Sequence, residues 1–288
     1  MPVNPSQAHD TLITAEGARL LHYLRSLPSY RQLLMFLVWK DLKVQVAHTV
    51  LGFGWLVLRP LLNALVLTLV FGRLARLPSE GHPYLLFLLS GFLPWSYFSG
   101  IAGKSANSLI GNSALVTKVY FPRLLLPASL AIAGLLELAV TLVFFFLLAA
   151  LAYGHLPDAN LIWLPLPLLV LLMVTLGTSF WLAALAARFR DVRQASGYVI
   201  QLLMFLTPVI WPLSLLTERL HLSLEPALVQ LLAGLHPLVG VVEGFRRVLL
   251  GGNMPWELLG LSLLTATLLF LSGVLYFQRS ERRLADGL

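Results

Sequence analysis

The sequence predicts an all-α integral membrane protein with six transmembrane helices, an N-terminal amphipathic interface helix and a re-entrant segment before the last span. Hydrophobic residues make up 58% of the 288 residues, charged residues make up 11%, and the mean hydropathy is +0.83. Because soluble domains carry about 25% charged residues, most of this surface must face lipid. Long charge-poor segments recur without any alternating strand pattern, which indicates a helical bundle and not a barrel.

The N-terminal region precedes the first apolar segment. Residues 1–29 contain Pro2, Pro5, Asp10 and Glu16 and no continuous apolar run, so we expect a cytoplasmic extension without a cleavable signal peptide. We expect the transmembrane domain to occupy residues 30–288. Within residues 30–47, apolar side chains share one helical stripe that excludes the charged ones: Met35, Val38, Trp39, Leu42 and Val46. This pattern predicts an amphipathic helix at the interface, and a helix that rests passively on the lipid headgroups is the alternative.

Seven segments approach the ~20 residues that a spanning helix needs. They are 49–71, 83–103, 124–153, 159–187, 194–217, 226–242 and 258–278. The sixth is short and contains a central His236-Pro237 pair, which favours a break in the helix. We therefore expect segment 226–242 to re-enter the membrane instead of spanning it, which leaves six spans.

The basic residues predict the orientation. With six spans, fourteen Lys and Arg residues lie on the N-terminal side and five on the opposite side. The positive-inside rule then places both termini in the cytoplasm and the re-entrant segment on the periplasmic side of a bacterial inner membrane. Seven spans would give thirteen basic residues on the N-terminal side and six on the opposite side, which differs little from the count for six spans. The break in the sixth segment therefore decides the number of spans.

Most kinds of active site are missing from the sequence. The chain has no cysteine, which excludes disulfides, thiolate metal sites and cysteine nucleophiles. No HExxH sequence or aspartate pair suggests a catalytic metal, and Gly103-Lys104-Ser105 lacks the first glycine of a P-loop. We expect no catalytic residue, metal or cofactor in this chain, and no nucleic acid as a partner, because its basic residues lie between apolar segments.

One catalytic alternative stays open. Gly177-Thr178-Ser179-Phe180 lies in the fourth segment and His236 in the sixth, so an intramembrane serine protease could use Ser179 with His236. Small residues in membrane helices more commonly mark close helix packing.

Charged residues in apolar surroundings are functional candidates because an unpaired charge there is costly. Arg59 lies in the first segment and Glu137 in the third; they could pair with each other, or Arg59 could extend towards water. Beyond the sixth segment, Glu243 can reach Arg246 at i+3 or Arg247 at i+4. The alternatives there are a salt-bridged helix end and an anion-binding ring at the outer mouth.

Aromatic residues concentrate in the second segment, around Pro94: Phe87, Phe92, Trp95, Tyr97 and Phe98. Flat aromatic faces suit the C–H side of a sugar ring, and a tyrosine hydroxyl can bind its polar edge. An interfacial belt in contact with lipid headgroups is the alternative.

Several strings resemble, in order, the landmarks of one family. They are Lys40-Asp41-Leu42-Lys43, Thr49-Val50-Leu51-Gly52-Phe53-Gly54-Trp55-Leu56, Leu93-Pro94-Trp95, Gly111-Asn112-Ser113, Lys118-Val119-Tyr120-Phe121-Pro122-Arg123, Phe189-Arg190-Asp191-Val192-Arg193, Met204-Phe205-Leu206-Thr207-Pro208-Val209-Ile210-Trp211-Pro212, His236-Pro237-Leu238 with Glu243-Gly244-Phe245-Arg246, and Glu281-Arg282-Arg283-Leu284-Ala285-Asp286. From about Tyr30 to the C-terminus, the chain resembles the permeases of type-2 ABC exporters for O-antigen, to which teichoic acid and capsule exporter permeases are related. Arg59 and His236 depart from the family pattern, where we expect glutamine and asparagine, and this affects only the expected lining of the pathway.

The resemblance implies a homodimer with a continuous channel between the protomers, bound to two copies of an ATP-binding ABC subunit that carries ATP and Mg²⁺. The substrate would be a polysaccharide on an undecaprenyl diphosphate lipid, moved from cytoplasm to periplasm. This chain would be the conduit and not an enzyme. A capsule or teichoic acid exporter is the alternative within the family, and a passive channel is the alternative outside it.

The resemblance also implies roles for particular residues. Phe92, Trp95, Tyr97 and Phe98 would contact sugar, with Arg59 in the same substrate pathway. A cytoplasmic gate near the lipid diphosphate would contain Gln45, Thr49, Gly52 and Gly54. Coupling to the ATPase, through a helix at 107–121, the 30–47 helix and the 188–193 loop, would use Asn107, Lys118, Tyr120, Phe121, Arg123, Arg190, Asp191 and Arg193. The periplasmic exit would contain His236, Glu243, Arg246 and Arg247.

Overall fold

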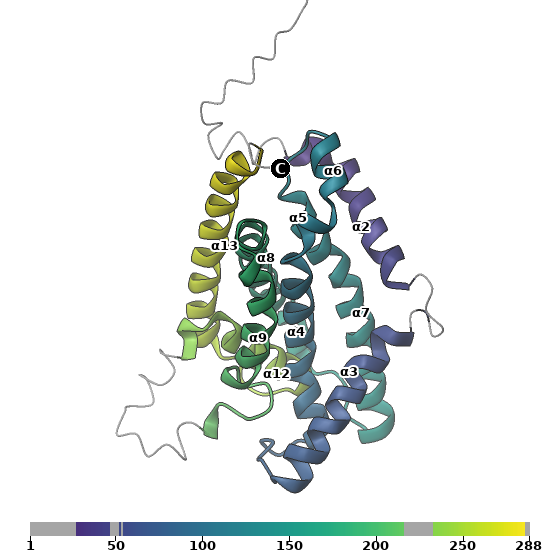
Figure 1. Cartoon of the computed structure of the whole chain (residues 1–288). Helices are drawn as coiled ribbons and strands as arrows, with labels where there is room; N and C mark the ends of the chain where they lie inside the picture. Colours follow the sequence, from purple (N-terminus) through teal and green to yellow (C-terminus); the bar gives the residue numbers. More distant parts are fainter. Residues whose placement is uncertain (1–26, 47–51, 53, 216–232, 286–288) are drawn as a thin grey trace, which may run out of the picture.

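The computed structural model describes residues 27–46, 52, 54–215 and 233–285, and every regular element in them is helical. In chain order these elements are η1 Leu27–Tyr30, α2 Arg31–Val46, α3 Gly54–Leu67, the π-helical η2 Thr68–Leu74, α4 Tyr84–Ser105, α5 Ser108–Gly111, α6 Ser113–Lys118, α7 Leu125–Tyr153, η3 Ala159–Trp163, α8 Pro165–Arg188, α9 Arg190–Leu206, α12 Pro237–Leu250 and α13 Trp256–Ala285. The long helices form one elongated bundle (Figure 1). The predicted all-helical class is confirmed for the described part of the chain.

Five helices in the described residues are long and apolar enough to cross a membrane: Gly54–Leu74, Tyr84–Ser105, Leu125–Tyr153, Ala159–Arg188 and Trp256–Glu281. The chain is therefore a multi-pass membrane protein. The fifth predicted segment, 194–217, does not reach the same length. Its helix α9 has 17 residues and ends at Leu206, and it measures about 25 Å against a hydrocarbon core of ~30 Å.

Two hydrogen bonds nevertheless show where α9 leads the chain. Asn160, just before α8, donates hydrogen bonds from Nδ2 to the carbonyls of Arg247 and Gly252, at 3.3 and 2.7 Å. The start of α8 and the end of α12 therefore lie at the same end of the bundle. Since α8 runs away from that end, α9 and the residues that follow it must lead the chain back.

The core of the bundle is built around α4, which lies at its centre in Figure 1. Its residues from Leu86 to Phe98 are almost all buried, against α3, α7, α8, α9 and α12. By contrast, α3 buries very few of its apolar side chains within the chain. The surface of α3 must therefore be covered from outside, by lipid or by another protein.

Glycine allows α8 and α13 to pack with their backbones in contact. A Cβ atom at Gly177 would lie 2.8 Å from the backbone nitrogen of Phe270, and one at Gly273 would lie 2.6 Å from the carbonyl oxygen of Gly177. This confirms the helix-packing interpretation of the Gly177-Thr178-Ser179 string.

The same packing argues against the protease alternative. Ser179 lies beside the part of α13 near Phe270, whereas Gly234, two residues before His236, packs against Leu261. Phe270 and Leu261 are nine residues apart in α13, which is about 13 Å along the helix axis. The Ser179 hydroxyl has no hydrogen-bond partner among the described residues.

Helix α2 differs from the predicted amphipathic arrangement. It runs along α7 (Figure 1), with Leu37 buried and with Lys40 and Asp41 half-buried on the side that meets the bundle. Met35 and Trp39, from the predicted stripe, are exposed. Lys40 and Asp41 have hydrogen-bond partners inside the protein, which is why they face inward, whereas Val38 and Leu42 of the predicted stripe are half-buried.

The predicted re-entrant segment 226–242 is described only from residue 233 onward. Its predicted break at His236-Pro237 is present, because His236 is extended and Pro237 begins α12. The helix then continues past the predicted end at residue 242 to Leu250. Helix α12 is almost wholly buried, and its 14 residues are too few to span.

Candidate functional site at the two ends of the bundle

The polar side chains gather at two opposite ends. We call the first the α12 end; it comprises the 75–83 loop, residues 207–215, α12 and the start of α13. We call the second the α6 end; it comprises α2, α5, α6, the start of α7 and the end of α13. In Figure 1 these are the lower and upper ends of the molecule.

A buried ion pair lies at the centre of the α12 end. Arg246 Nη1 donates to Glu243 Oε1 at 2.6 Å, and only 2% of the Arg246 surface is exposed. Arg246 Nη2 donates to the carbonyl of Val209 at 2.8 Å, and the guanidinium carbon lies 3.9 Å from the centroid of the Phe87 ring. These contacts connect α12 to α4 and to the residues after α9, so Arg246 fixes the relative position of three segments.

Arg247 extends the ion pairs towards the surface. Its Nη2 lies 3.0 Å from Glu80 Oε2 and 3.8 Å from Glu243 Oε2, and Ser214 Oγ donates to Glu80 Oε1 at 3.3 Å. The prediction that Glu243 reaches Arg246 or Arg247 is confirmed, and the carboxylate contacts both. Sequence reasoning missed Glu80, although its place in the Pro78-Ser79-Glu80-Gly81 turn, opposite the basic side of the membrane, was an available signal.

Two histidines lie beside this ion network. The rings of His82 and His155 are 6.2 Å apart and nearly perpendicular, and His155 Nε2 lies 3.1 Å from the carbonyl oxygen of Leu249. Burial, together with the nearby His155 and Arg247, lowers the pKa of His82, and Glu80 opposes this shift. His82 therefore favours its neutral form in the folded protein.

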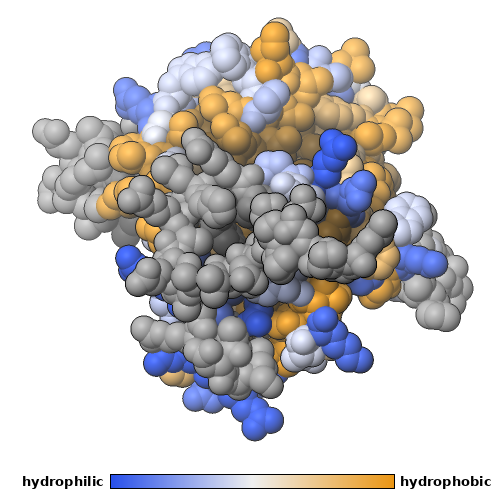
Figure 2. Space-filling view, turned by 90° about the horizontal axis from the view of Figure 1, so that it is seen from above, coloured by the Kyte–Doolittle hydropathy of each residue, from blue (hydrophilic) through white to orange (hydrophobic). Residues whose placement is uncertain are grey.

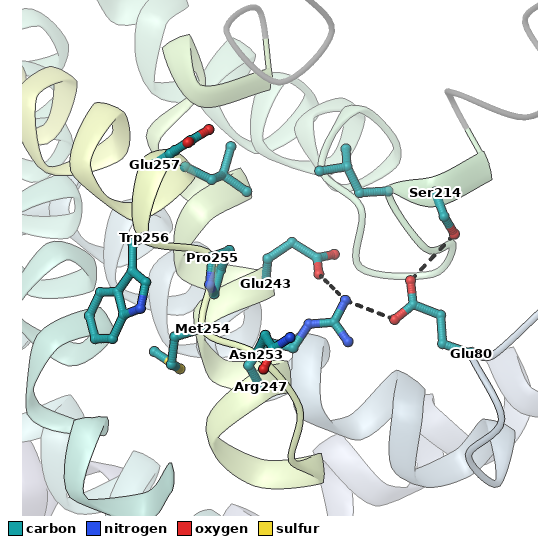
Figure 3. A pocket seen from close by; sticks show the side chains of 11 residues that line it. Glu80, Ser214, Glu243, Arg247, Asn253, Met254, Pro255, Trp256 and Glu257 are labelled. Atoms are coloured by element: carbon teal, nitrogen blue, oxygen red, sulfur yellow. Dashed lines mark hydrogen bonds and ion pairs between the residues drawn. The ribbon is translucent and has the colours of Figure 1, made fainter. Parts of the chain in front are cut away.

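A cavity of 710 Å³ opens next to the ion pairs. Its lining consists of Glu80, Leu213, Ser214, Glu243, Arg247, Asn253, Met254, Pro255, Trp256, Glu257 and Leu258. Figure 3 shows Arg247 between the carboxylates of Glu243 and Glu80, with Met254, Pro255, Trp256 and Glu257 to the left. His236, which was also predicted at this exit, does not line the cavity, and its Nδ1 is buried without a described hydrogen-bond partner.

At the α6 end, two adjacent aromatic residues have opposite environments. Tyr120 is 82% exposed, whereas Phe121 is 4% exposed and packs in a cluster with Leu37, Phe180 and Phe277. Tyr120 is therefore available to a partner, and Phe121 anchors the 119–123 connection in the fold. The two residues, predicted to share one role, thus differ in what their side chains contact.

Polar contacts connect the elements of the α6 end to one another. Lys40 Nζ donates to Asn112 Oδ1 at 2.7 Å, and Ser129 Oγ donates to Asp41 Oδ2 at 2.8 Å. The backbone N–H of Arg123 donates to Glu281 Oε1 at 2.8 Å, which joins the start of α7 to the end of α13. A displacement of the 112–123 segment would therefore be transmitted to α2 through Asn112 and to α13 through Arg123.

The remaining residues of the predicted coupling surface lie at or near the surface. Asn107, Lys118, Arg190 and Asp191 are exposed, and Arg193 and Arg123 are half-buried. Figure 2, which looks down on this end, shows hydrophilic side chains next to hydrophobic ones. Exposed aromatic and basic groups together are typical of a protein-binding surface.

The predicted sugar contacts occupy a different place from the one expected. Phe92, Trp95, Tyr97 and Phe98 are all buried in the core around α4, and the Tyr97 hydroxyl donates to the Ala131 carbonyl at 2.7 Å. None of them presents an open face to lipid or to a ligand in this structure. These residues form neither an open sugar-binding surface nor a belt in contact with lipid headgroups. Their contact with sugar stays a prediction, and their burial disfavours it.

The remaining predicted positions are scattered. Arg59 is exposed on α3 with its guanidinium carbon 5.6 Å from the Trp55 ring centroid, and no ion pair joins it to the half-buried Glu137 in the described part of the chain. Gln45 and Gly52 are half-buried and Gly54 is exposed, while Thr49 lies outside the described residues. Across residues 27–46, 54–215 and 233–281, no group of three or more His, Asp or Glu side chains could hold a metal ion.

Comparison with known proteins identifies the family. Residues 32–250 match the family described as ABC-2 type transporter. The chain belongs to this ABC-2 transporter family. It is 30% identical over 264 residues to the O-antigen export system permease protein RfbA of Myxococcus xanthus, a match that covers 91% of this chain and 98% of that protein. The resemblance to permeases of type-2 ABC polysaccharide exporters is thus confirmed.

Two further relatives of this ABC-2 transporter are more distant. The O-antigen export system permease protein RfbA of Klebsiella pneumoniae is 27% identical, with 88% of this chain and 94% of the relative covered. The polysialic acid transport protein KpsM of Escherichia coli is 23% identical, with 86% and 93% covered. In each case the similarity extends along nearly the whole of both chains.

Proposed function

We propose that this chain is the channel-forming permease of an ATP-driven exporter that moves lipid-linked polysaccharide, O-antigen above all, across the bacterial inner membrane. The observation that carries the proposal is the similarity to O-antigen export permeases over nine-tenths of the chain. A capsule exporter is the second candidate, favoured by the polysialic acid transport relatives. A teichoic acid exporter is the remaining alternative within the family.

The permease acts as a homodimer bound to two ATP-binding subunits, which hold the ATP and Mg²⁺. Six spans, with both termini in the cytoplasm, place the α6 end in the cytoplasm and the α12 end in the periplasm. The return of the chain to the α12 end after α8 supports α9 as the additional crossing. The sparse burial of α3 supports contact with lipid or with the second protomer.

The structure offers a physical route for coupling. A partner that displaces Tyr120 moves Phe121 and the start of α7, and through Arg123 and Glu281 it moves the end of α13. Helix α13 is packed against α8 through Gly177 and Gly273, so the two helices move together. Helix α12 contacts both of them and carries the ion pairs at the α12 end. Movement at the cytoplasmic surface can therefore change the periplasmic end.

The test joins genetics and biochemistry. Deletion of the gene should abolish surface polysaccharide and cause lipid-linked polymer to accumulate inside the cell, and the wild-type chain should restore export. The purified chain should hydrolyse no ATP alone and should form a stable complex with its ATP-binding subunit. Export that continues without any ATP-binding subunit would contradict the proposal and favour a passive channel.

A further inference from the structure

The cavity at the α12 end has the size of a ligand site. Its 710 Å³ lies within the range of about 300–1,000 Å³ for small-molecule sites and is far larger than the space of one water molecule. Side chains from the 75–83 loop, residues 213–214, α12 and the start of α13 line it together. Residues remote in sequence therefore converge on one space.

The polar lining suits a ligand with many hydroxyl groups. Carboxylates of Glu80, Glu243 and Glu257 can accept hydrogen bonds, and Arg247 and Asn253 can donate them. Neither the Asn253 nor the Glu257 side chain forms a hydrogen bond or ion pair with any residue that the structure describes, so both can bind a ligand. A sugar hydroxyl donates and accepts at once and can use both kinds of group.

The charge around the cavity disfavours an acidic ligand. Three carboxylates and the guanidinium of Arg247 line it, and Arg246 pairs with Glu243 from behind the wall, which leaves a formal charge of −1 at neutral pH. Arg247 is already engaged by Glu80 and Glu243, so it is poorly placed to neutralise an additional carboxylate or phosphate.

An apolar wall complements the polar groups. Met254, Pro255 and Trp256 follow one another along the cavity, and Trp256 is held by Trp163 with ring centroids 4.8 Å apart and planes at 84°. Apolar walls beside hydrogen-bonding groups match the two kinds of surface on a sugar ring.

The backbone of the 75–83 loop is strained where it reaches the cavity. Glu80 has a φ of 51°, in the left-handed region that residues with a side chain seldom adopt. The contacts of its carboxylate with Arg247 and Ser214 hold it there. Such strain persists where the surroundings fix it and is common at ligand sites.

We propose that the cavity at the α12 end binds a sugar unit that carries no acidic group, as a subsite for the exported glycan. The site rests on the proposed function, since a polysaccharide must be the cargo for the subsite to serve export. With this subsite, the cavity helps to determine which glycans are exported, because it accepts neutral or amino sugars. A glycan built of acidic sugars is repelled by the same carboxylates.

The absence of native cysteine allows a direct test. Leu213, a half-buried lining residue that forms no hydrogen bond to a ligand, is replaced in a Leu213→Cys variant, which is purified in lipid nanodiscs and labelled with a thiol reagent in the presence of N,N′-diacetylchitobiose, maltose, glucosamine or glucuronic acid. A neutral or amino sugar at about four times its Kd should slow labelling about fivefold, because the free fraction falls by the factor 1 + [L]/Kd. Glucuronic acid should give no protection. Adding Glu257→Gln should weaken the sugar about tenfold, while Glu137→Gln, a carboxylate outside the cavity, should change nothing.

Two results would overturn the subsite: no protection by any of the three non-acidic sugars, or equal protection by glucuronic acid. A Ser113→Cys variant at the α6 end is the control and should label at the same rate with or without sugar. Failure of the proposed function is recognised separately, because gene deletion would then leave surface polysaccharide unchanged whatever the labelling shows.

Discussion

The two ends of the bundle use polar side chains in different ways. At the α12 end, Arg246 and Arg247 pair with acidic side chains inside or at the edge of the fold. At the α6 end, Lys40 and Asp41 lie 3.4 Å apart and each also binds a neutral side chain, and Tyr120 remains open to solvent. The first arrangement fixes the geometry of a cavity, and the second leaves a surface for a partner. Loss of the buried charge pair at the α12 end should therefore damage the fold, whereas loss of the exposed Tyr120 at the α6 end should weaken an interaction.

The largest effect is expected from Arg246→Ala. It leaves the buried Glu243 with only the longer, 3.8 Å contact to Arg247, and should cost about 3 kcal/mol of stability. Thermal unfolding of the purified protein measures this loss. A Glu243→Gln, Arg246→Met double variant removes both charges and should recover part of it. A stable Arg246→Ala protein would show that the ion pair does not determine the structure of this end.

The adjacent aromatic residues give the next effect. Phe121→Ala empties a buried position and should cost about 3 kcal/mol. Tyr120→Ala is the matched control: it should leave the unfolding temperature unchanged and weaken the complex with the ATP-binding subunit, since exposed aromatic anchors carry much of the binding energy. Equal losses of stability in the two variants would remove the distinction between anchor and contact residue.

How far the sequence predicts these features depends on the distance between the partners. The spacing of Glu243, Arg246 and Arg247 predicts their pairing because one helical turn brings them together. Glu80 lies far away in sequence, and only the packing of the 75–83 loop on α12 makes it a partner of Arg247.

Burial in a membrane protein was harder to predict than helix formation. The aromatic residues of α4 have the composition of a lipid belt, yet α4 is surrounded by other helices. Apolar side chains suit lipid and protein interior alike, so composition does not separate these environments. For the same reason, the exposure of Tyr120 beside the buried Phe121 could not be read from their residue types.

A smaller effect is expected for Arg247→Ala, because this side chain and Glu80 are partly exposed. Loss of the pair should cost about 1 kcal/mol or less. The exchange of charges in Glu80→Arg, Arg247→Glu should restore part of that stability in a double-mutant cycle. Strictly additive effects of the two substitutions would indicate that the ion pair contributes nothing.

The smallest effect concerns pH. The pKa of His82 is lowered by burial, so protonation favours the unfolded state. The contribution of His82 to stability should be unaffected above its ordinary pKa of about 6.5 and should fall as the pH drops below that value. Unfolding temperatures at pH 7.5 and 5.5 should differ less in His82→Gln than in wild type. An equal difference in both proteins would assign the pH response to other groups.

The central claim is that the two ends face different compartments, and it depends on α9 crossing the membrane. Tyr120→Cys and Asn253→Cys are to be labelled with an impermeant thiol reagent in cells whose outer membrane alone has been permeabilised. The account predicts that Asn253→Cys reacts in these cells and that Tyr120→Cys reacts only after lysis. Labelling of both positions from the same side would contradict it, because α9 would then not return the chain across the membrane.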